Sequence, residues 1–220
     1  RLVEYYNQIP VIQFMFKSTE ADDIIAYVSQ NKLLEDYEKI ILSSDKDFFQ
    51  LLDDKTVLYR PIQKEILNKN SIVDKFDIHP TNFAMARAMA GDKSDNIEGI
   101  PGLGLKTISK RFPFLKEEAN KTFSDVLSHC KKELAEKEVK AYRSVVDSES
   151  VLRRNYQMMQ LYAPMLTLDA KSLVNETLQG ADQTFNKTEL IKMMIKDGFG
   201  VWDCTDLFAF FKRVVSDKKT

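Results

Sequence analysis

Three short clusters of acidic residues constrain the fold of this chain more than any other feature of its sequence. Each cluster lies where a strand or helix is expected to begin or end, and the third leads directly into a glycine-rich stretch at residues 99–104. The clusters are TEADD, SSDKDF and GDKSDN, and their seven carboxylates belong to Glu20, Asp22, Asp23, Asp45, Asp47, Asp92 and Asp95. The fold therefore has to place this concentrated negative charge at the ends of its elements.

Strand-like and helix-like patterns alternate through the first part of the chain. Short apolar runs predict strands buried in a parallel sheet, and the segments between them carry helical signals. Such alternation is typical of βαβ units, so the predicted fold class is α/β, with helices flanking a parallel sheet. The expected elements are the end of a helix at residues 1–8, buried strands at 10–16 and 39–44, a helix at about 20–35, and further strands at 56–60 and 65–67.

From Pro80 onward the pattern becomes helical and strand signals fade. Helices are expected at residues 81–90, 106–112, 158–168, 188–197 and 206–215, with one or two more within 116–154, and polar connectors are expected near 170–187 and at 198–200. We expect three regions: the carboxyl-terminal part of an α/β domain at 1–78, a helical region at 79–156, and a second helical region at 157–220 that packs back on the first. The first residue is Arg1, shortly before the first expected strand, so we expect further sequence upstream.

The overall charge excludes binding to nucleic acid through a global excess of basic residues. The formal net charge is −1, so any such binding has to come from segregated charge. Basic residues do gather at 101–121, a segment that contains only two acidic residues. The basic residues are Lys106, Lys110, Arg111, Lys116 and Lys121. Two widely spaced cysteines indicate a reducing compartment, and no apolar run approaches the ~20 residues of a membrane span. We expect an intracellular protein without membrane contact.

Capping is the ordinary explanation for acidic residues at helix ends. Asp and Glu favour the first turn of a helix because its free N–H groups and its dipole attract negative charge. Ser18 or Thr19 could cap the helix at 20–35 with Asp22 as capping-box partner, and Asp45 could cap the helix that follows it. Capping explains each cluster alone, but it does not explain three clusters in this order before a glycine-rich stretch.

The clusters also suit a site for divalent cations. On a helix Glu20 and Asp23 share one face while Asp22 points elsewhere. Asp45 and Asp47 follow a strand at the carboxyl edge of the sheet and, in an extended segment, project to the same side. Carboxylates gathered in one cleft repel each other unless cations neutralise them, and with no Cys or His near any cluster Mg²⁺ or Mn²⁺ is favoured over zinc. The chemistry that suits such a site is phosphodiester hydrolysis with two ions ~3.5–4 Å apart.

The glycine-rich stretch adds a candidate contact for phosphate groups. Gly99, Gly102 and Gly104 permit positive φ and close backbone approach, so a tight turn here could present N–H groups at the start of a helix. Lys106 and Lys110 would add positive charge without reading bases. A simple turn between two packed helices is the alternative. We expect structural roles for His79 and His129.

In order and spacing, these motifs resemble those of the 5′-nuclease family. The resemblance rests on Glu20-Ala-Asp-Asp23, on Ser44-Asp-Lys-Asp-Phe48 and the Gln-Leu-Leu that soon follows, and on the segment from residue 91 to residue 106. It covers about residues 10–112. The family includes flap endonucleases, polymerase-associated 5′–3′ exonucleases and the phage 5′-nucleases, and the phage members, such as the T-even ribonuclease H, are the most similar in these motifs.

The resemblance implies a PIN-like or Rossmann-like nuclease domain followed by a helix-hairpin-helix at residues 97–112. The hairpin would hold duplex DNA, with a K⁺ ion bound by carbonyls of the turn. Members of the family remove 5′ flaps or RNA primers during replication and repair, so the implied partners are branched or 5′-flap DNA, RNA–DNA hybrids and replication proteins. By the resemblance Glu20 and Asp22 would bind the first of two Mg²⁺ or Mn²⁺ ions, and Asp23, Asp45, Asp47, Asp92 and Asp95 would complete the catalytic cluster.

The family also places a strand, further metal-binding aspartates and a basic helical arch ahead of the position that matches Arg1. We therefore expect this chain to be part of a longer protein or to work with a separate amino-terminal segment, to be otherwise monomeric, and to cleave poorly alone. The implied location is the cytoplasm of a bacterium or of a phage-infected cell. Two other functions stay open: a PIN-type ribonuclease, which generally lacks the glycine hairpin, and a non-catalytic DNA-binding module whose acidic residues are structural.

Overall fold

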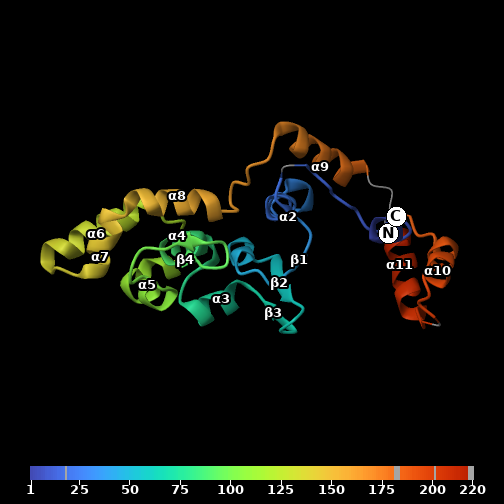
Figure 1. Cartoon of the computed structure of the whole chain (residues 1–220), viewed down its shortest axis with the longest axis horizontal. Coiled ribbons are helices and arrows are strands. Elements are labelled where there is room, and N and C mark those ends of the chain that lie inside the picture. The colour runs from blue at the N-terminus through green and yellow to red at the C-terminus, as the bar shows by residue number, and fades with distance from the viewer. Residues whose placement is uncertain (18, 181–183, 201, 218–220) are drawn as a thin grey trace. The chain divides into compact units, whose positions relative to one another are not determined.

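The computed structural model describes residues 1–17, 19–180, 184–200 and 202–217, which form two compact units. The larger unit is Thr19–Leu166, and the smaller unit combines Arg1–Ser18 with Thr167–Thr220. Figure 1 labels the elements of both units. All three acidic clusters and the glycine-rich stretch belong to the larger unit. The three regions expected from the sequence, with boundaries near 78 and 156, stay a prediction.

A three-stranded sheet forms the α/β part of the larger unit. Its strands are β1 (Lys39–Leu42), β2 (Thr56–Arg60) and β3 (Glu65–Leu67), in the order β1-β2-β3, and all three lie where the sequence predicts strands. β1 and β2 are parallel, as the fold class requires. β3 pairs with β2 antiparallel, because the connection at 61–64 is too short for the crossover that a parallel neighbour needs.

β1 is buried on one side only, although the sequence predicts a fully buried strand. Ile41 is buried, whereas Ile40 is 68% exposed and Leu42 is 67% exposed. Within the described residues β2 is the one strand beside β1, so β1 forms an edge of this sheet. An apolar run predicts a strand, but it does not reveal whether both faces are covered.

The strand predicted at residues 10–16 is wrong. Pro10 lies in a turn, residues 11–16 form no regular element and pair with no strand among the described parts of the chain, and Met15 is 88% exposed. An apolar run becomes a strand only where a neighbouring backbone accepts and donates its hydrogen bonds.

The predicted capping box of the next helix is also wrong. α2 (Ala21–Ser29) has Glu20 as its N-cap, and the Glu20 side chain makes no capping hydrogen bond. Thr19 therefore does not pair with Asp22 as a box, and Ser18 lies outside the described residues. The helix ends at Ser29 rather than near residue 35, and the short 3₁₀ helix η1 (Lys32–Leu34) follows.

An aromatic cluster joins the sheet to the helical part of the same unit. Phe49 belongs to the 3₁₀ helix η2 (Asp47–Leu51), Phe76 ends α3 (Lys69–Phe76), and Phe83 follows the 3₁₀ helix η3 (Pro80–Asn82) and begins α4 (Phe83–Ala90). The ring centroids of the three phenylalanines lie between 5.3 and 5.8 Å apart. These contacts fix η2, and with it the second acidic cluster, against α4.

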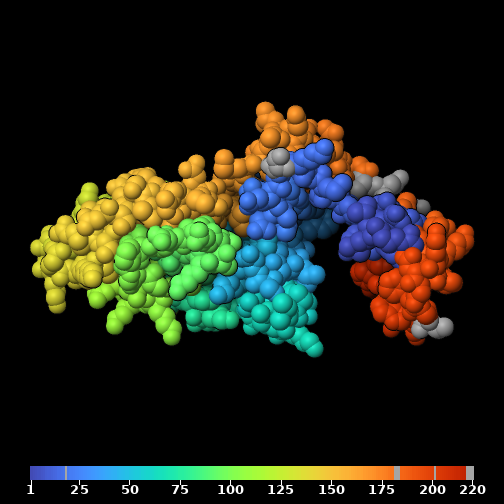
Figure 2. Space-filling model, viewed as in Figure 1, coloured from blue at the N-terminus to red at the C-terminus, as the bar shows by residue number. Residues whose placement is uncertain are grey.

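α4 is the central helix of the larger unit, and its residues 83–89 are all buried. It packs against α5 (Leu105–Arg111) and α8 (Glu149–Met159). Figure 2 shows the yellow surface of α8 running along the green segments of this unit. The 3₁₀ helix η4 (Pro113–Lys116) comes next along the chain. It is followed by α6 (Phe123–Glu136), α7 (Lys140–Asp147) and α8. One or two helices are predicted within 116–154, but breaks near 137–139 and at 148 divide this region further.

Within the described residues, the regular elements of the smaller unit are all helices. Its helices are α1 (Leu2–Tyr6), α9 (Leu168–Gly180), α10 (Lys187–Lys196) and α11 (Thr205–Asp217). Helices predicted at 1–8, 188–197 and 206–215 are confirmed. The helix predicted at 158–168 is wrong because α8 ends at Met159, and α9 occupies most of the predicted polar connector. That sequence is polar because α9 buries little more than Ala170 and Val174.

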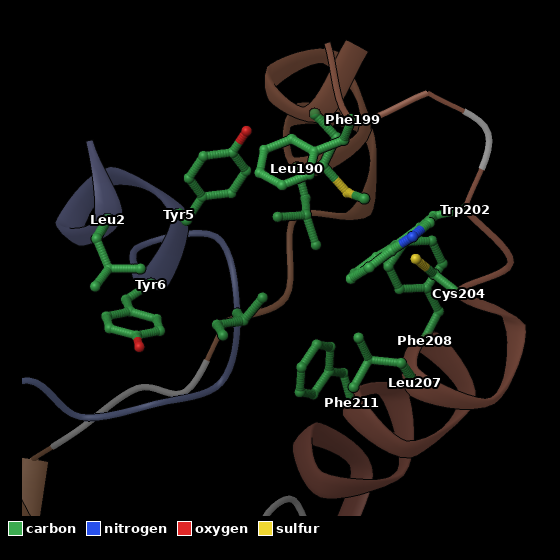
Figure 3. Close-up of a pocket in the computed structure, with 12 residues that line it drawn as sticks. Leu2, Tyr5, Tyr6, Leu190, Phe199, Trp202, Cys204, Leu207, Phe208 and Phe211 are labelled. Carbon is green, nitrogen blue, oxygen red and sulfur yellow. The ribbon is translucent and has the colours of Figure 1, made fainter. Parts of the chain in front are cut away.

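α1 is held to α10 by polar contacts and by an apolar pocket. Nε of Arg1 donates to Asp197 at 2.6 Å, and the hydroxyl of Tyr5 donates to the same carboxylate at 2.7 Å. These bonds lower the pKa of Asp197. Aromatic and aliphatic side chains, Phe199 and Trp202 among them, surround a cavity of about 260 Å³ (Figure 3).

Within the described residues no helix has the length and apolar character needed to cross a bilayer.

Candidate metal centre

The second acidic cluster lies just beyond the carboxyl end of β1. The backbone N–H of Asp45 donates to the hydroxyl of Ser43 at 3.1 Å, and the carboxylate of Asp45 accepts from the N–H of Asp47 at 2.9 Å. The chain turns directly into η2, so the prediction that Asp45 and Asp47 extend side by side from one straight segment is wrong. Buried Phe48 and Phe49 anchor η2 and direct Asp47 inward, while Asp45 stays exposed.

The third cluster lies in a tight loop between β4 (Gly91–Asp92) and β5 (Ile97–Glu98), which pair antiparallel. Gly91 and Gly99 allow this pairing because their backbones nearly touch: a Cβ on Gly91 would lie 2.2 Å from the nitrogen of Gly99. Asn96 takes a left-handed conformation with φ 56° to close the loop. The loop holds Asp92 and Asp95 on the side that faces η2.

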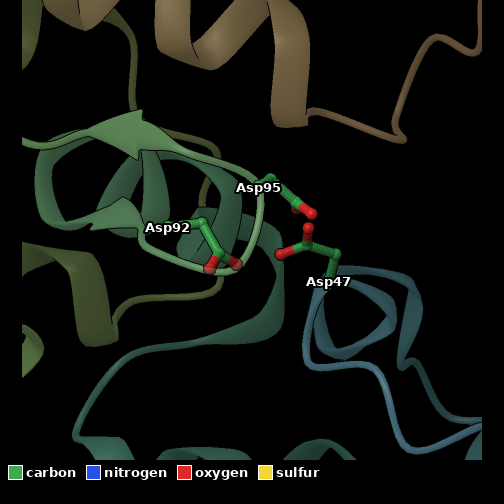
Figure 4. A group of neighbouring side chains, drawn as sticks. All are labelled: Asp47, Asp92 and Asp95. Atoms are coloured by element: carbon green, nitrogen blue, oxygen red, sulfur yellow. The ribbon is translucent and has the colours of Figure 1, made fainter.

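Asp47, Asp92 and Asp95 form the meeting point of the second and third clusters. One carboxylate oxygen from each lies within 4.8 Å of the others. Figure 4 shows Asp47 and Asp95 directed toward one another, with Asp92 on the other side of Asp47. Asp47 and Asp92 are half-buried and Asp95 is exposed. A group of carboxylate oxygens alone suits a hard cation such as Mg²⁺ or Mn²⁺.

The first cluster acts on the same group from α2, which packs against η2. The pKa of Asp22 is raised by burial and then by the negative charges of Asp45, Asp47, Glu20 and Asp23. The helix-face argument selected Glu20 and Asp23 over Asp22. The structure instead makes Glu20 the N-cap, outside the regular helix, and places Asp22 in the first turn, where the charges of Asp45 and Asp47 raise its pKa.

Sequence reasoning missed Arg87, the residue that links the second and third clusters. Its Nε donates to Oδ1 of Asp47 at 2.9 Å, and its Nη2 donates to Oδ2 of Asp92. Arg87 is 8% exposed within α4. A signal for it exists, because it is the single charged residue in the apolar run FAMARAMA that leads into the third cluster.

The two half-buried aspartates respond in opposite ways to these surroundings. Burial raises the pKa of Asp47, the charge and hydrogen bond of Arg87 lower it, and the charges of Asp45 and Asp92 raise it, with a net upward shift. Burial would also raise the pKa of Asp92, but hydrogen bonds from Ser94 and Arg87 lower it to about 2. Asp92 is therefore held as a carboxylate by its partners, whereas Asp47 carries a charge that its surroundings only partly compensate.

The glycine-rich stretch places its predicted contact residues differently. Gly99 is enclosed by the chain itself, since a Cβ there would lie 2.1 Å from the carbonyl oxygen of Ala90. Gly102, with φ 82°, forms the turn, and Gly104 is the N-cap of α5; both face open space. Lys106 and Lys110 on α5 are exposed, and their contact with phosphate groups stays a prediction.

Buried Asn155 fastens this stretch to the rest of the unit. Its side-chain amide donates to the carbonyl of Ala88 at 3.1 Å and to that of Glu98 at 2.8 Å. α8 thereby holds the end of α4 and the start of the glycine-rich stretch in one arrangement.

Comparison with known proteins places these residues in a family. Residues 2–77 match the family model of the 5′-3′ exonuclease N-terminal resolvase-like domain. A 5′-3′ exonuclease of Aquifex aeolicus is 30% identical over 190 residues, which cover 77% of this chain and 66% of that protein. The chain is therefore similar in sequence to the 5′-3′ exonuclease family. It spans just under two thirds of the length of this relative.

Solved structures agree on the fold. A point mutant of T5 5′-exonuclease has a TM-score of 0.61 at 20% identity, covering 80% of this chain and 78% of that chain. A bacteriophage T5 flap endonuclease, described as a pseudo-enzyme–product complex with DNA and metal ions, has a TM-score of 0.56 at 21% identity, covering 83% of this chain and 61% of that chain. The α/β fold predicted from the sequence is therefore that of the 5′-nucleases.

Proposed function

We propose that this chain is the metal-binding and DNA-binding part of a structure-specific 5′-nuclease that hydrolyses phosphodiester bonds at 5′ flaps or RNA primers. The observation that carries the proposal is the convergence of Asp47, Asp92 and Asp95 from two separate segments, with carboxylate oxygens within 4.8 Å of one another. Similarity to the 5′-3′ exonuclease family supports the reaction. The T5 complex with DNA and metal ions supports the choice of partners.

Mg²⁺ or Mn²⁺ is the proposed cofactor, because the converging donors are all carboxylate oxygens. When bound, two such ions would supply positive charge for the attacking and leaving oxygens and would favour ionisation of water. The chain's own part is to fix the carboxylates by burial and by the bonds of Arg87 and Ser94. The residues proposed to hold the ions are Glu20, Asp22, Asp23, Asp45, Asp47, Asp92 and Asp95.

The glycine-rich stretch and α5 are proposed to hold duplex DNA through its phosphates. Gly102 and Gly104 leave open space beside the backbone, and Lys106 and Lys110 are exposed on α5. Contacts of this kind fix the position of DNA without reading its sequence, which suits an enzyme that recognises a branch. A K⁺ ion at the turn and replication proteins as partners are parts of the same proposal.

A 5′-labelled flap duplex tests the reaction. In Mg²⁺, the intact protein that contains this chain releases short labelled products. Asp47→Asn or Asp95→Asn lowers the rate by about a hundredfold or more, the range typical for loss of one group that stabilises transition-state charge. Asp169→Asn, which removes an exposed carboxylate at the start of α9, serves as the matched control and leaves the rate unchanged. Full activity in the Asp47 variant, or in excess chelator, contradicts the proposal.

Two other outcomes would point to the alternatives. Cleavage of single-stranded RNA in preference to the flap favours a PIN-type ribonuclease. Binding of flap DNA without stoichiometric uptake of Mn²⁺ in calorimetry favours a non-catalytic DNA-binding module, because its acidic residues would then be structural.

A further inference from the structure

Arg87 bonds to two of the three converging aspartates, and the proposed function gives it only the task of fixing them in place. It sits in α4 among buried apolar residues and is itself 8% exposed. All three nitrogens of its guanidinium group are engaged: Nε with Asp47 at 2.9 Å, Nη2 with Asp92, and Nη1 with the carbonyl of Gly91 at 3.4 Å. One side chain thus joins the segment after β1 to the segment after α4.

These bonds decide how freely the carboxylate oxygens can bind another cation. Asp92 accepts from Arg87 at Oδ2, and at Oδ1 it accepts from the backbone N–H of Ser94 at 2.8 Å and from the Ser94 hydroxyl. Asp47 accepts from Arg87 at Oδ1. Oδ1 of Asp47 and Oδ2 of Asp92 are thus already bonded to the guanidinium, so a divalent ion that uses either oxygen has to share it with Arg87 or displace the guanidinium.

The positive charge of Arg87 opposes the binding of a divalent cation to the group. An arginine in a protein does not lose its proton, so Arg87 cannot neutralise itself when a cation arrives. Its positive charge repels a divalent ion strongly at the short distances within the group, where little water screens the interaction. The same charge stabilises the metal-free protein, because Asp47 and Asp92 are half-buried and would repel each other without it.

We propose that Arg87 is a positioning residue that serves as an internal counter-ion: it holds Asp47 and Asp92 together in the metal-free protein and limits the affinity of the group for divalent cations by competing with them. The inference rests on the proposed metal site. It predicts opposite effects when the guanidinium is removed: the metal-free protein becomes less stable, and the divalent cation binds more tightly.

Arg87→Gln tests both effects in the 220-residue chain, which needs no substrate. Thermal unfolding is measured in chelator, and Mn²⁺ binding is measured by calorimetry. We expect a lower unfolding temperature in chelator and a dissociation constant for Mn²⁺ about tenfold lower than in the wild type, the size expected when one nearby like charge is removed. Saturating Mn²⁺ should then raise the unfolding temperature of the variant more than that of the wild type, whereas a purely structural arginine predicts the same rise in both.

Two further variants separate this role from general effects of charge and folding. Arg143→Gln removes an exposed arginine of α7, which pairs with Glu138 ahead of that helix. This variant should leave Mn²⁺ binding unchanged. Arg87→Lys keeps the charge but cannot bridge two carboxylates, so Mn²⁺ should bind about threefold more tightly. Should Arg87→Gln fail to fold, the lysine variant carries the test alone.

The outcomes distinguish this inference from the proposed function. Mn²⁺ binding that is unchanged or weaker in whichever Arg87 variant folds overturns the counter-ion role, while the metal site itself stands. Absence of stoichiometric Mn²⁺ uptake by the wild type overturns the metal site, and with it both proposals.

Discussion

The glycine-rich stretch directly follows the third acidic cluster in the sequence, but it is held in place by different interactions from those at Asp47 and Asp92. Around Asp47 and Asp92 the fold uses charged side chains, because Arg87 bonds to both carboxylates. At Gly99 it uses contact between backbones, since no Cβ fits beside the carbonyl of Ala90. The first arrangement depends on charge, whereas the second depends on shape.

This difference matches what each region is proposed to do. Ion pairs can exchange one cation for another, so the acidic group can adjust when a metal ion enters. Packed backbone cannot adjust in this way, and the amide of Asn155 adds two hydrogen bonds that leave the stretch little freedom. A rigid turn beside an adjustable acidic group would hold DNA at a fixed distance from the ions.

Gly99→Ala should produce the largest effect, because it breaks the arrangement that depends on shape. The new Cβ would lie 2.1 Å from the Ala90 carbonyl oxygen, and backbone atoms cannot move aside cheaply. We expect a loss of more than about 3 kcal/mol in the free energy of unfolding, measured with denaturant. Gly104→Ala is the matched control: it has φ −88° and no neighbour within 4 Å, so it should cost less than about 1 kcal/mol. Equal losses in the two variants would show that close packing at Gly99 is unimportant.

The sequence predicts the fold class and the acidic clusters well because both depend on local patterns. β1, β2 and β3 form where the sequence has apolar runs of strand length. The second and third clusters come directly after the ends of β1 and α4. The edge exposure of Ile40 and the failed strand at 10–16 were not predictable, since pairing depends on which neighbour is present rather than on the strand itself.

Side-chain networks were harder to predict than the clusters they support. Arg87 looks like an ordinary helix residue until the fold brings Asp47 beside it. Glu20 lies outside the regular helix and Asp22 within its first turn because α2 begins one residue later than the capping argument assumes. The roles of Gly99 and Gly104 differ for the same reason: both are glycines in one motif, but only tertiary contacts show which one lacks room for a side chain.

Acid should affect the charge-dependent region selectively. The pKa of Asp92 is lowered from 3.8 to about 2, so its charge contributes stability that is present above its ordinary pKa and is lost as the pH falls through about 2. The pKa of Asp47 is raised, so its protonation begins at higher pH and relieves repulsion instead. In chelator, we expect the unfolding temperature of the wild type to fall as the pH is lowered from about 4 to 2. In Asp92→Asn the unfolding temperature should depend less steeply on pH over the same range. Asp169→Asn should keep the wild-type slope. A steep fall that persists in Asp92→Asn would assign the acid sensitivity to other carboxylates.

Lys106→Ala should give the smallest effect and the most specific one. Lys106 is exposed on α5, so its loss should leave the unfolding temperature unchanged. If it contacts one phosphate, DNA affinity falls by a similar factor for every sequence, and the slope of log K against log salt concentration decreases in magnitude by about 0.9. Lys131→Ala, at an exposed position of α6, is the control for net charge and should keep the full slope. Asp47→Asn, measured in chelator, should also keep it, because the acidic group carries no phosphate contact of its own. A slope unchanged in Lys106→Ala would remove this lysine from the DNA interface. The shape-dependent region would then have to contribute through the backbone of Gly102 and Gly104, and a salt-independent loss of binding in Gly104→Ala would be the sign of it.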